Sequence, residues 1–259
     1  MKLLVETAFR ISRGEKMVFD GTEILIGKGA QAEVFLYKGY AYKVYKETYP
    51  AEWISFEKKQ QREVNKAGLC PVRYYDTDDP HIIRMDYIDG LMLEKIVNDC
   101  ASGKEVDEIS DVPDGFRMLS KAFHFIHKAD IREMDIPRFE ETAAMGLSKE
   151  NGEKIIPVIE RISAKSGECL CHLDMHFLNI MIPKDKSGFK IIDWMNARIA
   201  PPVFDYARTY VILKEFSKEA LELYEAAVLP DLKELCISEP DFIDAVEVCS
   251  IVRAREKDC

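Results

Sequence analysis

The 259-residue chain is predicted to fold as an α+β protein of two lobes, and two observations carry this prediction. Strand-like segments dominate the chain up to about residue 88, whereas the residues after Gly90 show mostly helical patterns. The length and a hydrophobic content of 47% are ample for the cores of two lobes. We therefore expect an N-terminal lobe over 1–88, made of an antiparallel sheet and one helix, and a mainly helical lobe over 89–259.

In the first lobe, aromatic and β-branched residues predict strands, and a run rich in Glu, Lys, Gln and Arg predicts one helix. Gly68 follows that helix, as a glycine at a helix end should. The expected strands are 22–26, 34–37, 40–45 and 81–88, and the expected helix is 51–67.

The second lobe is predicted to be mainly helical, with short strand-like runs between the helices. A polar segment, 99–114, separates the first two helices, and the segment 130–154 is acidic and interrupted. Helices are expected over 91–97, over 116–128 and from Tyr206 onward, with breaks near Pro230 and Pro240, and strand-like runs over 170–182 and 189–192.

Composition argues against a secreted or membrane protein. No run approaches the ~20 apolar residues that a membrane span needs. The start, Met1-Lys2-Leu3-Leu4-Val5-Glu6, becomes acidic too early for a signal peptide. The seven cysteines are odd in number and irregularly spaced, which favours reduced thiols over a disulfide framework. We therefore expect a cytoplasmic protein with no membrane partner.

The net charge of −10 is spread unevenly. Residues 1–86 hold 14 Lys/Arg and 13 Asp/Glu, whereas 87–259 hold 22 and 33, a net charge of −11. So acidic a second part argues against nucleic acid as a partner, because phosphates require a basic surface. It would suit a cationic ligand, although such a charge also serves solubility alone.

Two features of the first lobe are suited to contact a polyphosphate. The stretch Gly27-Lys28-Gly29-Ala30-Gln31-Ala32-Glu33-Val34 joins two expected strands, and its small residues let a backbone approach phosphates closely. It opens no helix and lacks the Gly-Lys-Ser/Thr of a Walker loop, so an ordinary hairpin is the alternative. Lys43, on the third strand, could reach phosphates beneath this loop or be a surface lysine. The loop residues expected at the nucleotide are Gly27, Gly29, Ala30 and Gln31.

The second lobe carries two carboxylates and an amide in an apolar context. Asp174 and Asn179 lie in His172-Leu173-Asp174-Met175-His176-Phe177-Leu178-Asn179, and Asp193 follows 14 residues after Asn179. Phosphoryl transfer needs a carboxylate to orient the attacking hydroxyl and oxygen ligands for Mg²⁺. Asp174 can do the first job, and Asn179 and Asp193 the second, although a single Asp such as Asp193 can equally be a turn residue.

A glycine loop, a strand lysine, a helix, His-x-Asp with Asn at +5, and an Asp after an apolar strand follow the protein-kinase-like order. On Cys171–Asn179, Ile192–Met195 and Phe204–Thr209, the chain resembles the aminoglycoside phosphotransferase and choline kinase family. The resemblance runs from about residue 20 to about residue 225. It implies a bilobal protein-kinase-like fold, with a nucleotide-binding lobe over 1–88 and a catalytic and substrate-binding lobe over 89–259.

The resemblance also implies the cofactors ATP and Mg²⁺ and a role for each motif residue. Asp174 would be the catalytic base, and Asn179 and Asp193 would hold Mg²⁺. His172 and Asp205 would support the catalytic loop structurally rather than take part in the reaction.

For the nucleotide, the resemblance implies that Lys43 contacts the α- and β-phosphates and is steadied by a helix carboxylate. Glu57 is the chosen partner, and Glu52 and Glu63 remain alternatives because one sequence does not fix the helix register. Backbone groups of Met85-Asp86-Tyr87-Ile88 would meet the adenine.

Four positions depart from the family pattern. Leu173 stands where the family usually has Gly, Ala32 stands at the third glycine position, and Trp194-Met195 replace the Phe-Gly of the protein-kinase motif. None of these changes removes a catalytic group, but Leu173 bears on loop geometry and on the class of substrate.

We expect an enzyme that transfers the γ-phosphoryl group of ATP to a hydroxyl of a small molecule. Because the second part of the chain is acidic, our hypothesis is that the acceptor is cationic, such as an aminoglycoside, amino sugar or amino alcohol. A protein Ser/Thr kinase is a less favoured alternative, because only eleven residues separate Trp194 from Tyr206 and no Ala-Pro-Glu closes them. A pseudokinase-like binding module would lack a catalytic group, and Lys43, Asp174, Asn179 and Asp193 are all present.

A zinc site is a further alternative, because Cys169, Cys171, His172 and His176 are ligands that zinc favours. Against it, Cys-x-Cys-His has no matching second pair, and Asp174 would go unexplained. His124 and His127 lie three residues apart in an apolar helix, where at least one is expected to be a core or supporting residue.

Overall fold

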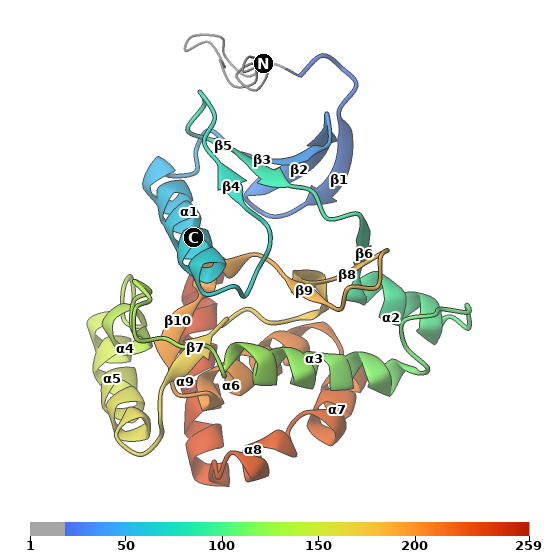
Figure 1. The fold of residues 1–259 in the computed structure, drawn as a ribbon. Coiled ribbons are helices and arrows are strands. Elements are labelled where there is room, and N and C mark those ends of the chain that lie inside the picture. The colour runs from blue at the N-terminus through green and yellow to red at the C-terminus, as the bar shows by residue number, and fades with distance from the viewer. Residues whose placement is uncertain (1–18, 259) are drawn as a thin grey trace, which may run out of the picture. The chain divides into compact units, whose positions relative to one another are not determined.

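The computed structural model describes residues 19–258, which form two compact units (Figure 1). The first unit holds 19–58 and 72–87, and the second holds 59–71 and 88–258. Residues 59–71 thus lie in the second unit, although they precede the expected boundary at residue 88. The start Met1 to Glu6, which argues against a signal peptide, and Cys259 lie outside the described residues.

The first unit is a five-stranded antiparallel sheet in the order β1-β2-β3-β5-β4, as predicted for this lobe. Ile54 and Ile83 are fully buried at its core, where the first half of α1 packs on the sheet with Tyr45 and Ala32. The elements are β1 (Ile24–Lys28), β2 (Ala32–Tyr37), β3 (Tyr40–Tyr45), α1 (Ala51–Lys66), β4 (Tyr74–Tyr75) and β5 (Ile82–Asp86).

Helix α1 ends where the sequence predicts. Gly68 has φ of +72°, a left-handed conformation that favours glycine, and the Leu69 N–H closes the helix end on the Val64 carbonyl at 3.1 Å. Helical spacing places apolar Ile54 and Val64 on buried faces, while Glu52 and Trp53 are exposed. The helix therefore brings Glu57, which shares the buried side with Ile54, into the first unit's core.

The second unit contains short strands between helices. Strands β6 (Gly90–Met92), β8 (Ile180–Pro183) and β9 (Lys190–Ile191) form one small antiparallel sheet. Strand β7 (Cys169–Cys171) pairs with β10 (Arg198–Ala200). Two single-turn 3₁₀ segments, η1 (Phe177–Asn179) and η2 (Trp194–Asn196), follow β7 and β9 along the chain.

Helix α6 forms the centre of the second unit and packs along α9 (Figure 1). Phe204 and Ala207 of α6 and Ala245 of α9 are fully buried in one apolar core. The helices are α2 (Leu93–Ala101), α3 (Val112–Ile126), α4 (Phe139–Thr142), α5 (Lys149–Ser163), α6 (Val203–Phe216), α7 (Lys218–Ala227), α8 (Asp231–Glu234) and α9 (Glu239–Asp258).

Several expected elements differ from the observed ones for physical reasons. The segment 130–154 is expected to be interrupted, but helix α5 begins within it at Lys149, because Ser148 caps its start and its apolar face outweighs Pro157 inside the helix. The expected helix over 91–97 begins only at Leu93, because Gly90–Met92 pairs with β8. The expected break near Pro240 is observed, because α8 ends at Glu234 and α9 begins at Glu239, with Pro240 in the first turn of α9, where a missing N–H costs nothing.

Among residues 19–258, no helix is both long enough and apolar enough to cross a membrane.

Candidate functional site

The loop that carries Asp174 follows β7 and is fastened by a buried carboxylate on α6. Asp205 is fully buried, and its oxygens accept hydrogen bonds from the backbone N–H groups of His172 (3.0 Å) and Leu173 (2.7 Å). Leu173 has φ of +57°, a left-handed conformation that costs a residue with a side chain roughly 1–2 kcal/mol. The two hydrogen bonds hold that conformation, which also explains why glycine would suit this position.

Asn179 and Asp193 flank the two strands of one β-hairpin. Ile180 of β8 lies opposite Ile191 of β9, and the next backbone pair is joined by a hydrogen bond from Ile192 N–H to the Asn179 carbonyl, at 3.0 Å. Asn179 therefore enters the hairpin at the end where Asp193 leaves it. This pairing explains their spacing of 14 residues and brings an amide and a carboxylate to one end of the sheet.

Asn179 is also tied to Asp174. Its Nδ2 donates to the Asp174 backbone carbonyl at 2.8 Å and lies 3.4 Å from the Asp174 carboxylate. Because Nδ2 donates inward, the amide Oδ1 is the atom that a metal would take. Amide and carboxylate oxygens are hard donors of the kind that Mg²⁺ prefers, so Asn179 and Asp193 fit a magnesium site chemically.

The Asp174 carboxylate is partly exposed, and His176 Nε2 lies 3.7 Å from it. Burial alone would raise the pKa of Asp174, but the hydrogen-bonding and charge of His176, with smaller contributions from Arg208 and His172, outweigh it. The net pKa of Asp174 is lowered, so the group is an ionised carboxylate near neutral pH and can accept a proton. Sequence reasoning did not single out His176 as this neighbour, although its spacing of two from Asp174 was a usable signal.

His172 is fully buried and structural in its contacts. Its Nε2–H donates to the Ile192 carbonyl at 3.0 Å, and its ring packs on Trp194 with centroids 4.8 Å apart. Burial lowers the pKa of His172, against the opposing charges of Asp205 and Asp174. The ring is therefore neutral at neutral pH and links the loop of Asp174 to the segment that carries Asp193.

In the first unit, Lys43 forms an ion pair with Glu57, its Nζ 2.8 Å from Oε1. Glu57 is nearly fully buried and also accepts hydrogen bonds from the Tyr45 and Tyr74 hydroxyls. Glu63 instead binds Lys66 and the Asp135 N–H in the second unit. The choice of Glu57 over Glu63 and Glu52 as the partner of Lys43 therefore agrees with the geometry.

The glycine stretch is a tight turn between β1 and β2. Gly27 pairs with Val34, the Gly29 N–H donates to the Ala32 carbonyl at 2.8 Å, and Ala30 and Gln31 lie exposed at the tip. Both expectations for this stretch, a phosphate loop and a hairpin, are compatible with that shape.

The segment expected at the adenine begins inside strand β5. Met85 and Asp86 end that strand, and the Asp86 carboxylate accepts hydrogen bonds from the Arg73 N–H and the Tyr75 hydroxyl. Tyr87 is exposed and is the last residue of the first unit, and the chain returns to the second unit at Ile88. The Asp86 side chain therefore has a structural task.

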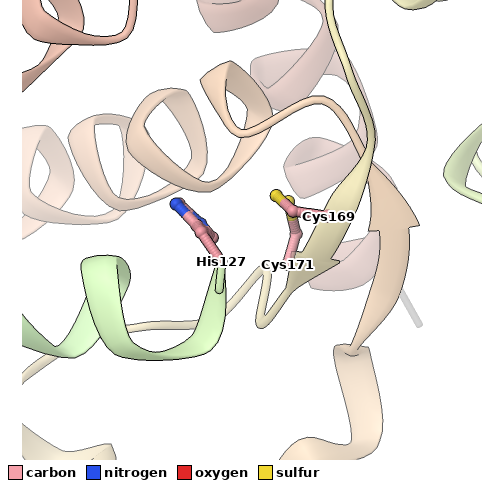
Figure 2. A group of neighbouring side chains, drawn as sticks. All are labelled: His127, Cys169 and Cys171. Atoms are coloured by element: carbon pink, nitrogen blue, oxygen red, sulfur yellow. The ribbon is translucent and has the colours of Figure 1, made fainter. Parts of the chain in front are cut away.

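The cysteines and histidines of the second unit are not arranged as in the zinc site considered above. Cys169 and Cys171 lie with His127 rather than with His172 and His176, and the three ligand atoms are within 4.8 Å of one another (Figure 2). Both thiols donate to the Ala200 carbonyl at 3.5 Å, and His127 Nε2 lies 2.9 Å from the Asp205 carboxylate.

Hydrogen bonding explains this cluster without a metal. Burial is the main cause that raises the pKa of the Cys171 thiol, so that thiol stays protonated near neutral pH and keeps its hydrogen bond. His127, which sequence analysis expected to be core or supporting, adds a third hydrogen bond to Asp205. His124 instead lies beside Asp231, with Nε2 and Oδ2 3.3 Å apart.

Comparison with known proteins decides the family. A model described as the phosphotransferase enzyme family matches residues 24–236, which is most of the chain. The chain belongs to this family. The resemblance stated from the motifs is therefore confirmed, and the phosphotransferase has the α+β kinase-like fold that was predicted. A search of curated proteins finds no match to this phosphotransferase.

Solved structures similar to the phosphotransferase share its fold at low identity. An aminoglycoside-3'-phosphotransferase of type VIII is 15% identical, with a TM-score of 0.59 over 90% of this chain and 93% of the other. APH(3'')-Id from Streptomyces rimosus, in complex with ADP and streptomycin, is 12% identical, with a TM-score of 0.60 over 92% and 93%. A choline/ethanolamine kinase family protein from Mesorhizobium loti is 15% identical, with a TM-score of 0.56 over 92% and 79%.

Proposed function

We propose that this phosphotransferase moves the γ-phosphoryl group of ATP to a hydroxyl of a small molecule. The observation that carries the proposal is the fastened loop of the second unit: Asp205 fixes the backbone beside Asp174, and Asn179 binds Asp174 directly. A loop held in this way positions an ionised carboxylate for a reaction that depends chiefly on orientation.

In the proposed reaction, Asp174 accepts the proton of the acceptor hydroxyl. The hydroxyl oxygen forms a bond to the γ-phosphorus, the bond between that phosphorus and the β–γ bridging oxygen breaks, and ADP leaves with the electron pair. His172 stays neutral throughout and keeps the loop attached to the Ile192 carbonyl. The lowered pKa of Asp174 keeps the base ionised before each turnover.

Magnesium and the nucleotide complete the proposal. Asn179 and Asp193 would hold Mg²⁺, whose chemistry is to neutralise charge on the phosphates of ATP. Lys43, oriented by Glu57, would contact the α- and β-phosphates, and the turn with Gly27, Gly29, Ala30 and Gln31 and the backbone of Met85–Ile88 would bind the rest of the nucleotide.

The net charge of the second part is weaker evidence for a cationic acceptor than the sequence suggested. Many acidic residues considered for a cationic pocket form local ion pairs with nearby basic residues. Asp99 binds Lys95 and Lys104, and Arg117 binds Asp111 and Asp114. Carboxylates that are matched in this way attract a cationic acceptor only weakly.

A matched pair of variants tests the proposed reaction. Asp174→Asn should lower ADP release with a turned-over acceptor by about 10²–10⁴-fold, because a positioned base is lost. Asp185→Asn, at an exposed turn, makes the same change of charge away from the loop and should keep its rate. Acceptors to screen are aminoglycosides, choline, amino sugars, hydroxy acids and sugar phosphates. Unchanged turnover in Asp174→Asn would refute the assigned role.

Two further measurements address the alternatives. Labelled ATP with a peptide library should give no broad Ser/Thr labelling, and broad labelling would favour a protein kinase. A shift in melting temperature with millimolar ATP and Mg²⁺ is expected, and its absence would favour a module that does not use nucleotide.

A further inference from the structure

A small cavity inside the second unit is lined by an excess of arginines. Its volume is about 40 Å³, whereas one buried water needs roughly 10–15 Å³ by the same measure. The space suits about three waters or one small oxyanion group. Leu173, the residue before Asp174, is among its lining residues. Its polar lining is Thr142, Asn196, Arg198, Arg208, Arg255 and Glu256.

Arg208 supplies a buried donor with no acceptor. The residue is 3% exposed, its Nε donates to the Leu173 carbonyl at 3.1 Å, and its Nη2 donates to the Glu256 carboxylate. Its Nη1 is buried and has no hydrogen-bond partner among residues 19–258. Buried donors of this kind are rare in native proteins, and an unfilled ligand position is one explanation.

The other two arginines add positive charge to the same walls. Arg198 Nε donates to the Thr142 hydroxyl at 2.9 Å, and burial is the main cause that lowers the pKa of Arg198 to about 10. The charge of Arg255 lowers that pKa further, and the charge of Glu256 opposes it. Arg255 Nη2 lies 3.6 Å from Glu256. Glu256 is thus the one carboxylate in the lining against three guanidinium groups.

Local charge outweighs the acidic total of the second part at such a site. Leu173, which directly precedes Asp174 in the chain, lines the cavity, so the cavity lies beside the loop that carries the proposed base. Exposed charges farther away than about 8 Å are largely screened at physiological salt, whereas partly buried neighbours are not. The cavity therefore attracts anions although residues 87–259 carry a net charge of −11.

We propose that this cavity binds an oxyanion group, a carboxylate or a phosphate, carried by the hydroxyl acceptor. This inference rests on the proposed phosphotransfer, and it names the acceptor class as an anionic hydroxy compound in place of a cation. Arg208 Nη1 supplies the buried donor that such a group would accept from, and the charges of Arg198 and Arg255 add to its attraction; Arg255 Nη1 itself donates to the Ala143 and Met145 carbonyls. An acceptor held beside Leu173 would offer its hydroxyl to the next residue, Asp174.

Binding of simple oxyanions tests the cavity without any turnover. Sodium sulfate and sodium acetate, at millimolar concentration against sodium chloride of equal ionic strength, should raise the melting temperature of the wild-type protein. Arg255→Gln should weaken the apparent affinity about 10- to 100-fold, as loss of a charge-assisted hydrogen bond does. Arg255→Lys keeps the charge but not the fork, and should fall between the two.

Arg132→Gln is the matched control, because Arg132 is an exposed arginine that forms an ion pair with Asp130 away from the cavity lining. It should respond to sulfate as the wild-type protein does. An equal response in Arg255→Gln would place the ion elsewhere, such as the nucleotide phosphates' own site, and would overturn the proposal. Absence of any response in the wild-type protein would overturn it as well. A response to sulfate alone or to acetate alone distinguishes phosphate-like from carboxylate ligands.

The preference of the enzyme among acceptors is the second test of the proposal. Hydroxy acids or sugar phosphates should be phosphorylated in preference to amino alcohols and aminoglycosides, and Arg255→Gln should raise their KM about 10- to 100-fold. Preference for a cationic acceptor would overturn the acceptor class. If no acceptor releases ADP, the proposed function fails, while the sulfate measurement still decides whether the cavity binds anions.

Discussion

Two clusters of buried charged residues, one in each unit, differ in their balance of positive and negative groups. In the first unit, one lysine, Lys43, faces one carboxylate, Glu57, and two tyrosine hydroxyls satisfy the remaining lone pairs of that carboxylate. In the second unit, three arginines and one carboxylate, Glu256, line the cavity, and one guanidinium nitrogen of Arg208 has no partner among the described residues. The first cluster is complete, and the second has room for an anion.

A buried ion pair and a buried excess of positive charge therefore have different consequences for the protein. A charge removed from water is stable only when opposite charge and hydrogen bonds replace its hydration. The Glu57 carboxylate meets this condition through Lys43 and the Tyr45 and Tyr74 hydroxyls. The arginine cluster meets it fully only when an external anion joins, so its stability should depend on what the solution contains.

The largest effect should come from making the complete cluster incomplete. Glu57→Gln keeps the shape of the side chain but removes its charge, so Lys43, which is 15% exposed, loses the carboxylate that it faces in the first unit. Loss of one partner of a buried pair costs about 3–5 kcal/mol, and the residual exposure of Lys43 favours the lower value. We expect the free energy of unfolding, measured in urea, to fall by about 3 kcal/mol.

Glu52→Gln is the control for that variant, because Glu52 lies on the same helix but is exposed. Its free energy of unfolding should change by less than about 0.5 kcal/mol. Equal losses in the two variants would mean that the burial of Glu57 is unimportant, and the contrast between the clusters would collapse.

A smaller effect is expected where hydrogen bonds, rather than a cation, stabilise a buried charge. Asp205 accepts from two backbone N–H groups and from the His127 ring. In Asp205→Asn an amide N–H₂ would face one of these donors, which should cost about 2 kcal/mol of stability. The strained φ of Leu173 would then relax, so kcat should fall while the KM for ATP stays nearly unchanged.

Asp231→Asn separates the two consequences. Asp231 is also buried, but it accepts from Ser120 of α3 and Tyr206 of α6 rather than from the backbone of the Asp174 loop. A similar loss of stability with an unchanged kcat is expected. A fall in kcat of equal size in both variants would show that Asp205 does not act by positioning the loop.

Much of the Lys43–Glu57 cluster was predictable from the sequence, and most of the arginine cluster was not. Lys43 and Glu57 belong to a strand and a helix of clear periodicity, so their elements were placed within one residue at each end. Asp174, Asn179 and Asp193 lie in short motifs whose spacing follows from one hairpin. Local patterns suffice where the side chains that act together come from regular, adjacent elements.

The arginine cluster depends on contacts between distant segments. Arg198, Arg208 and Arg255 come from β10, α6 and α9, and nothing in their spacing brings them together. Strand β10 was missed because three residues carry too little periodicity, and its pairing with β7 is non-local. Net charge pointed toward a cation for the same reason, since a sum over a sequence does not say which charges are matched.

The smallest effect should come from a pair that is matched but exposed. Arg161 of α5 bonds to Asp241 and Asp244 of α9, and the arginine remains 39% exposed. Hydrogen bonds from Ser238 and Arg161 lower the pKa of Asp241 to about 2. A carboxyl whose pKa is lowered by folding stabilises the protein above its unfolded value and loses that contribution as pH falls through the folded one.

Arg161→Ala should therefore cost only about 0.5–1 kcal/mol at pH 7, because water already solvates these charges. The cost should shrink between about pH 4 and pH 2, as Asp241 takes up its proton in both proteins. Urea unfolding at several pH values measures this, with Lys149→Ala as an exposed control at the start of α5. A loss as large as that of Glu57→Gln would show that matching alone, and not burial, sets what an ion pair contributes here.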